Sequence, residues 1–233
     1  MKRRLAKLVC LLTLLSPMLH AGDMLDRIVA TVNQKPILAS DVDDAAHFEA
    51  LQQGKVPDAM DTNRRAVLNR VIERELICQQ MPDTFEPAVA AIDAHIAEIR
   101  TQFPMAKTEA EWSDLLATFG FDESILRDDV RLQLKVVHFL DIRLRPTVRV
   151  DNEEIGDYYS RTLVPKLKAA GATAEPIDKL KDKIEEVLLQ QKMTEVFDAW
   201  VANLKSQGSI RVLDPDLATP VTATAEKGSA TTR

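Results

Sequence analysis

Residues 25–43 read LDRIVATVNQKPILASDVD, and this stretch decides how the chain begins to fold. Its first eight residues are rich in β-branched side chains and partly alternate, residues 33–36 have the composition of a turn, and Ile37 and Leu38 resume the apolar pattern. This pattern predicts a short β-hairpin. Ser40 stands three residues before Asp43, as in a capping box, so we expect a helix from there to about Gln53.

Helical periodicity dominates the rest of the chain. Apolar residues recur at helical spacing at about 61–80, 86–102, 108–119, 122–143 and 175–207. Thr108 with Glu111 has the spacing of a capping box, and Asp151 is placed to cap a further short helix. Additional apolar residues widen the apolar face of segment 122–143. This width predicts a helix that lies at the centre of the fold. With a strand at 209–213 after Gly208, the expected fold is mainly α, with an N-terminal β-hairpin and a C-terminal strand.

The N-terminus has the three-part layout of an export signal. Four cations precede or flank an apolar run from Leu8 to Leu15, Pro17 interrupts it, and Ala21 offers a small residue at a cleavage point. The run is far shorter than the roughly 20 residues that span a bilayer. We therefore expect residues 1–21 to be a signal peptide that is cleaved near Ala21, which places the protein in the periplasm without stable insertion in the membrane.

Charge and cysteine content limit the partners of the exported chain. Residues 22–233 hold 26 Lys and Arg against 36 Asp and Glu, a formal net charge of −10. An acidic surface repels phosphate backbones, so nucleic acid is not expected as a partner. Cys78 is the one cysteine left after cleavage, so we expect the fold to depend on its core and not on disulfides. From Asp214 the sequence loses periodicity, which predicts a disordered tail at 214–233.

Motifs of enzyme chemistry are absent from the sequence. It contains no Gly-rich phosphate loop, no GxSxG, no HExxH and no CxxC, and His47, His95 and His138 are far apart. Cys78 lies in an apolar stretch, as a buried, inert thiol does, although a pair with His138 stays an alternative. No catalytic residue, metal site or cofactor is therefore predicted.

One region instead concentrates large apolar side chains around short helices and turns. Aromatic rings and a flexible thioether there suit the binding of varied apolar segments. The alternative is that these side chains fill the core. We call a polypeptide whose apolar segments bind there a client. The candidate client-binding residues are Phe103, Met105, Trp112, Phe119 and Phe121.

Three stretches resemble the SurA family of periplasmic chaperones. They are residues 25–42 directly after the export signal, residues 145–159 (RPTVRVD, then EEI and the Tyr pair), and the closing helix and strand at 189–212. The resemblance covers residues 24–213. It implies that residues 22–213 form one helical chaperone domain, in which the closing segment 175–213 packs on the N-terminal block 24–145.

One departure from the family concerns catalysis. Members usually carry one or two parvulin-type prolyl isomerase domains before the closing helix, whereas this chain has only residues 161–176 there, with one Gly and no His. Isomerase activity is therefore not carried over from the resemblance.

The sequence is compatible with three functions. The resemblance favours an ATP-independent holdase that binds unfolded outer-membrane or secreted polypeptides. The alternatives are a minimal prolyl isomerase and a structural envelope component that binds one folded partner. Neither the clients nor the oligomeric state follows from the sequence.

Overall fold

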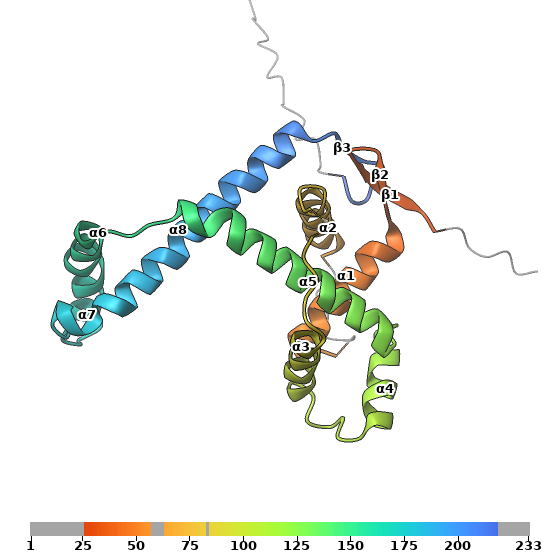
Figure 1. Ribbon diagram of the computed structural model, residues 1–233, viewed down its shortest axis with the longest axis horizontal. Coiled ribbons are helices and arrows are strands. Elements are labelled where there is room, and N and C mark those ends of the chain that lie inside the picture. Colours follow the sequence, from red (N-terminus) through yellow and green to blue (C-terminus); the bar gives the residue numbers. More distant parts are fainter. Residues whose placement is uncertain (1–25, 57–62, 83, 219–233) are drawn as a thin grey trace, which may run out of the picture.

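The computed structural model describes residues 26–56, 63–82 and 84–218, and it is mainly helical (Figure 1). Strands β1 (Ile28–Val32), β2 (Lys35–Leu38) and β3 (Ile210–Val212) form an antiparallel sheet in the order β2–β1–β3. Asn33 and Gln34 join β1 to β2 with positive φ angles of 49° and 74°. A two-residue hairpin turn of this kind matches the twist of its strands. The predicted fold class is confirmed. The expected signal peptide lies outside the described residues.

Strand β3 brings the C-terminal part of the chain back to the N-terminal hairpin. Ala30 pairs with Val212 and Val32 with Ile210, and Asn33 Oδ1 accepts a hydrogen bond from the Ser209 amide at 2.7 Å. The central strand of the sheet therefore belongs to the beginning of the chain, and one of its two neighbours belongs to the end.

A first hydrophobic cluster lies beneath this sheet. The sheet packs on α1 (Ala39–Gln52), α2 (Arg64–Cys78) and the C-terminal end of α8 (Ile177–Gln207). Val29, Val32 and Val42 are completely buried in it. Burial of each such side chain contributes roughly 1.5–3 kcal/mol. The end of α8 is thus held by the same core as the hairpin.

The two capping boxes expected from the sequence have different outcomes. Thr108 and Glu111 form theirs at the start of α4 (Glu109–Thr118), with the Thr108 amide donating to Glu111 Oε2 at 2.8 Å. The prediction for Ser40 is wrong. Helix α1 already begins at Ala39, Asp41 Oδ2 accepts from the Leu38 amide at 2.7 Å, and the Ser40 hydroxyl donates to Asp26.

A second hydrophobic cluster lies below the first. It joins the end of α1, α3 (Val89–Thr101), α4 and the first half of α5 (Glu123–Leu144). Leu126 and Val130 of α5 are completely buried in it. Because the second half of α5 continues towards α8, this one helix links the two clusters.

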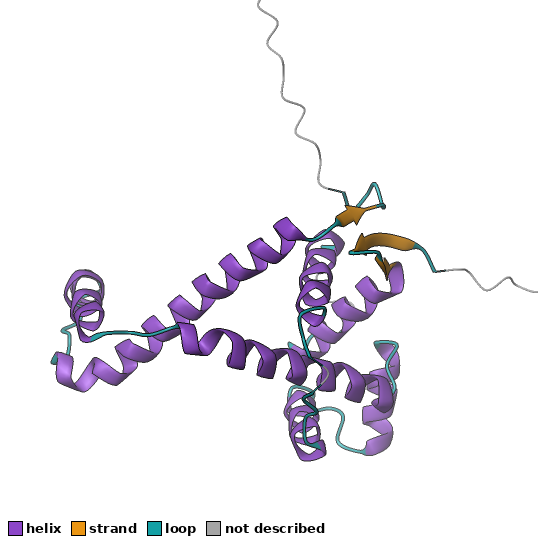
Figure 2. Cartoon of the chain, turned by 45° about the horizontal axis from the view of Figure 1, so that its top comes forward, coloured by secondary structure: helices purple, strands orange, loops and turns teal. Residues whose placement is uncertain are grey.

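The remaining elements form an arm that projects from the two clusters (Figure 2). After a short 3₁₀ turn at Arg145–Thr147 come α6 (Asn152–Asp157), one π-helical stretch (Tyr158–Leu163) and α7 (Val164–Ala169). They lie at the N-terminal end of α8, whose 31 residues span about 46 Å. Ile155 of α6 and Ile184 of α8 are buried, and Lys192 Nζ donates to the Arg149 carbonyl at 2.6 Å.

The tail prediction is wrong for its first five residues. Asp214 is buried and its carboxylate lies 2.8 Å from the Arg27 guanidinium, while Leu217 is buried in the first cluster. Arg65 also donates to the carbonyls of Leu217 and Ala218. These contacts order residues 214–218 although their sequence shows no periodicity. Residues 219–233 lie outside the described part.

Candidate functional site

Four of the five predicted client-binding residues lie inside the protein. Phe103, Trp112, Phe119 and Phe121 expose 4% of their surface or less, and all four belong to the second cluster. The Phe103 and Phe119 rings meet edge to face with centroids 6.2 Å apart. The prediction that these four side chains form a binding surface is therefore wrong, and the alternative, that they fill the core, is what the structure shows.

Short helices explain this burial. Helices α3 and α4 are too short to form a core alone, so the aromatic side chains at their ends and turns fill the space between them and α5. Arg100 lies over the Trp112 ring with its guanidinium carbon 5.6 Å from the centroid, which seals the outer side. Met105 is different because it is 60% exposed.

An apolar cleft runs along the second half of α5. Its first part, of about 270 Å³, lies between α5, α1 and α2, and its second part, of about 310 Å³, lies between α5 and α8. The two parts share Val137, Leu140 and Phe197. We call the whole the α5 cleft. Its further apolar lining comes from Ala45, Phe48, Val71, Ile77, Leu132, Val136, Leu144 and Met193.

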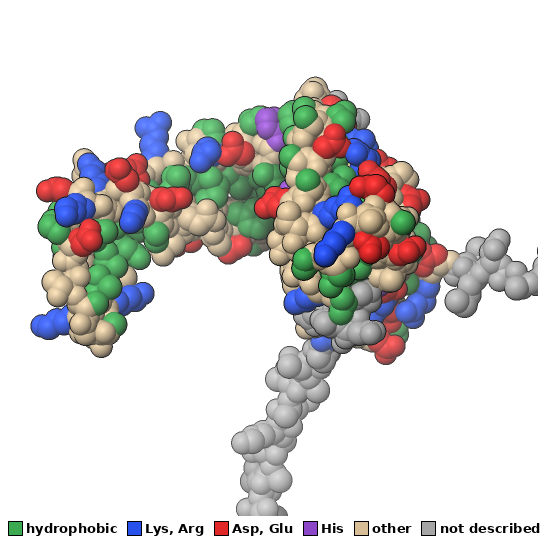
Figure 3. All heavy atoms as spheres, turned by 90° about the horizontal axis from the view of Figure 1, so that it is seen from below, with side chains coloured by type: hydrophobic (Ala, Val, Ile, Leu, Met, Phe, Trp, Pro, Cys, Tyr) green, Lys and Arg blue, Asp and Glu red, His purple; other side chains and the backbone are tan. Residues whose placement is uncertain are grey.

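Val137 stands out in this cleft. It is 56% exposed and lies where the two parts meet, since it lines both of them together with Leu140 and Phe197. Figure 3 shows hydrophobic side chains gathered on the span between the arm and the two clusters. Exposed apolar surface that is contiguous and rimmed by polar groups is typical of a binding site.

Charged side chains of both signs surround the first part of the cleft. Arg70 of α2 makes a two-bonded ion pair with Glu49 of α1, at 2.6 and 2.5 Å. Glu73 of α2 pairs with Lys205 of α8 at 2.5 Å. These pairs connect the helices that form the walls, so the rim is held in place while the floor stays apolar.

Asp129 and Arg74 both line the first part of the cleft. Burial raises the pKa of the Asp129 carboxyl, and the positive charge of Arg74 opposes this effect. The pKa of Asp44, on α1, is also raised by burial, and His47 opposes it. A carboxyl with a raised pKa between apolar walls indicates a site that is partly shielded from water.

The residues considered for catalysis do not come together. The His47 ring meets the Phe119 ring edge-on, and the His138 ring stacks on the Phe85 ring. His95 Nδ1 lies 3.6 Å from Glu98 Oε2. Burial raises the pKa of the Cys78 thiol, which opposes formation of a nucleophilic thiolate. Among the described residues, no three His, Cys, Asp or Glu side chains group as metal ligands do.

Comparisons with known proteins add no relatives, because no family model and no curated protein sequence matches this chain. In the described part of the chain, no helix has both the length and the apolar character that crossing a membrane requires.

Sequence reasoning missed the residues of the α5 cleft. The helical spacing predicts only that Val137 lies on the apolar face of a central helix and Phe197 on that of the closing helix, and it does not single out Leu140. A signal was present, because α5 carries apolar residues on more of its circumference than one packed face needs. The positions of α1, α2 and α8 in space determine which of them stay uncovered.

Proposed function

We propose that the protein is an ATP-independent periplasmic chaperone that holds apolar segments of unfolded exported polypeptides in the α5 cleft. The observation that carries the proposal is the exposure of Val137 at the junction of two apolar hollows. The resemblance of the sequence to the SurA family supports the same class of function.

The apolar surface of the cleft favours binding of many different segments. Covering such surface contributes about 25 cal/mol per Å², and the contribution does not depend on the order of residues in the partner. The site therefore suits segments that share apolar character and not one sequence. Ion pairs between the walls, such as Arg70 with Glu49, keep the cleft open when no client is bound.

Client protection by the mature chain tests this proposal. An outer-membrane β-barrel protein is diluted from denaturant without ATP, and its aggregation is followed by light scattering with and without the protein. Val137→Glu places a charge on the cleft floor, so we expect a loss of at least half of the protection. Ile125→Glu is the matched control, because Ile125 is an exposed apolar residue of the same helix that does not line the cleft.

The two variants decide the outcome together. Equal protection by wild type and Val137→Glu, with unchanged melting temperatures, would contradict the assignment of the cleft. Equal loss in both variants would point to an effect of charge on α5 in general. Saturable acceleration of prolyl isomerisation would favour an enzyme, and capture of one stoichiometric folded partner would favour a structural component.

A further inference from the structure

A second hollow lies on the other side of α5. It has a volume of about 640 Å³ and is bounded by α5 and the segment that follows α2. Its apolar lining comes from Met81, Pro82, Phe85, Phe139, Ile142 and Pro146. We call it the Phe85 pocket. Its volume is in the range of small-molecule sites, roughly 300–1,000 Å³.

This pocket is separate from the α5 cleft. Lys135, His138 and Ile142 follow one another at spacings of three and four residues, so they share one face of α5. Val137 and Leu140 lie on the opposite side and line the cleft. A ligand in one hollow therefore leaves the other free.

The walls of the pocket are apolar and partly aromatic. Phe85 stacks on His138 with ring centroids 3.6 Å apart and an interplanar angle of 23°. Phe139 in turn lies 6.1 Å from the Trp200 ring of α8. Ile142, which also lines the pocket, is 61% exposed. An apolar body that enters here covers the Phe85 ring and Ile142 at once.

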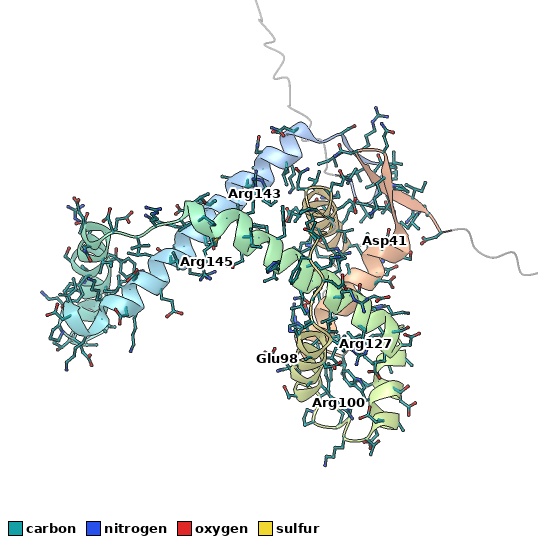
Figure 4. All side chains as sticks on the ribbon, in the orientation of Figure 1. Asp41, Glu98, Arg100, Arg127, Arg143 and Arg145 are labelled. Atoms are coloured by element: carbon teal, nitrogen blue, oxygen red, sulfur yellow. The ribbon has the colours of Figure 1, made fainter. Side chains whose placement is uncertain are left out.

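The charged side chains in the described lining of the pocket are positive, and an acid, Glu86, pairs with one of them. Lys135 and Arg143 line it, and none of the described lining residues is acidic. Lys135 is paired with Glu86 at 3.2 Å. For Arg143, the described residues provide no ion pair, whereas Arg145 at the same end of α5 pairs with Asp141 at 3.2 Å (Figure 4). The Arg143 side chain is also exposed, so its guanidinium is accessible to an anion in the pocket.

We propose that the Phe85 pocket binds a small amphiphilic monoanion, an apolar chain or ring that carries one carboxylate. The apolar body lies between Phe85, Phe139 and Ile142, and the carboxylate accepts hydrogen bonds from the Arg143 guanidinium. Arg suits this role because its planar fork matches the two oxygens of a carboxylate. This site is independent of client binding in the α5 cleft.

Three probes with one chain and different head groups test the proposal. Octanoate, 1-octanol and octylammonium are titrated into the mature full-length protein by calorimetry at low salt. We expect saturable binding with one site per chain, tightest for octanoate and weakest for octylammonium. The intrinsic tryptophan fluorescence is a second readout, because the ring of Trp200, one of the two tryptophans, has its centroid 6.1 Å from that of Phe139. Equal affinity for the three probes, or no saturable binding of octanoate, overturns the proposal.

Substitutions then locate the site. Arg143→Gln is expected to weaken octanoate about fivefold and to leave 1-octanol unchanged, because only the carboxylate needs the guanidinium. Arg145→Gln is the matched control, with the same chemical change at the same helix end and no place in the pocket lining. Ile142→Ser is expected to weaken both probes. Equal effects of Arg143→Gln and Arg145→Gln on octanoate overturn the assignment to Arg143.

A further variant separates this site from the proposed chaperone function. Val137→Glu is expected to leave the affinity for octanoate unchanged, since Val137 lines the α5 cleft only. Loss of octanoate binding in Val137→Glu, with the fold intact, overturns the independence of the two sites.

Discussion

The two halves of α5 carry the same kinds of side chain in different surroundings. Leu126 and Val130 in the first half are completely buried, whereas Val137 and Ile142 in the second half are 56% and 61% exposed. Helices α3 and α4 and the end of α1 pack on the buried face of the first half, whereas α8, parts of α1 and α2, and the segment after α2 approach the second half without covering it. The elements that cover an apolar stretch, and not its residue types, therefore decide whether it becomes core or surface.

The path of α8 explains why the second half of α5 stays open. Its C-terminal end is fixed in the first cluster by Val201 and Leu204, and its N-terminal end carries α6 and α7. The two long helices cross and diverge instead of running side by side (Figures 1 and 2). The arm and the exposed cleft therefore have the same structural origin.

The largest expected effect comes from the core that covers the first half of α5. Phe119→Ala removes a completely buried ring from the second cluster, so we expect the free energy of unfolding to fall by about 3–5 kcal/mol. Chemical denaturation measures this change. Met105→Ala is the control, since Met105 is 60% exposed, and we expect a change within about 0.5 kcal/mol. Similar values for the two variants would contradict the burial of the aromatic cluster.

A second test compares the halves of α5 directly. Leu126→Ala is expected to lower the free energy of unfolding by about 2–5 kcal/mol, because it opens a cavity in a packed core. Val137→Ala is expected to change it by less than about 1 kcal/mol and to weaken client protection instead. Unfolding and aggregation assays on both variants measure the contrast. If Val137→Ala destabilises the protein as strongly as Leu126→Ala does, Val137 is packed like a core residue and the second half of α5 is not open.

A smaller effect is expected at the rim of the cleft. Arg70 and Glu49 are partly exposed, so their pair across α1 and α2 should contribute about 0.2–1 kcal/mol. A double-mutant cycle with Arg70→Met and Glu49→Gln isolates this coupling. High salt should reduce it, since exposed charges are screened. A coupling of zero at low salt would show that the pair does not hold the two walls together.

The smallest effect concerns Asp129 and depends on pH. Burial raises the pKa of this carboxyl in the folded state, so the folded protein loses stability as the pH rises from the unfolded-state pKa through the folded-state pKa. Asp129→Asn removes this loss, so we expect a gain on the order of 0.5 kcal/mol at pH 7. The gain should vanish when the pH falls below the unfolded-state pKa. Unfolding of both proteins across acidic and neutral pH measures it, and a gain that persists at low pH would point to another cause.

Local chemistry explains which parts of the fold could be predicted. The hairpin at Asn33, the Thr108 capping box and the helical stretches depend on neighbours in sequence, and each is present. Residues 214–218 were missed because their order comes from Arg27 and Arg65, which lie far away in the sequence.

The candidate site was harder to predict for a related reason. Phe119 and Val137 are both apolar residues in helical surroundings, and their sequence neighbourhoods do not show which of them is covered. The binding surface was predicted at the aromatic residues, because their large apolar rings suit the binding of apolar segments. The same chemistry makes them the best residues to fill a core between short helices.

By itself, the sequence determined the helices, the hairpin and the closing strand of this protein, because spacing and turn residues act over a few positions. Only the tertiary structure decided that β3 joins β1, that the aromatic cluster is core, and that Val137 lies at the floor of an open cleft. The physical reason is that burial depends on the elements that meet a side chain in space. Those elements come from parts of the chain that no local pattern connects.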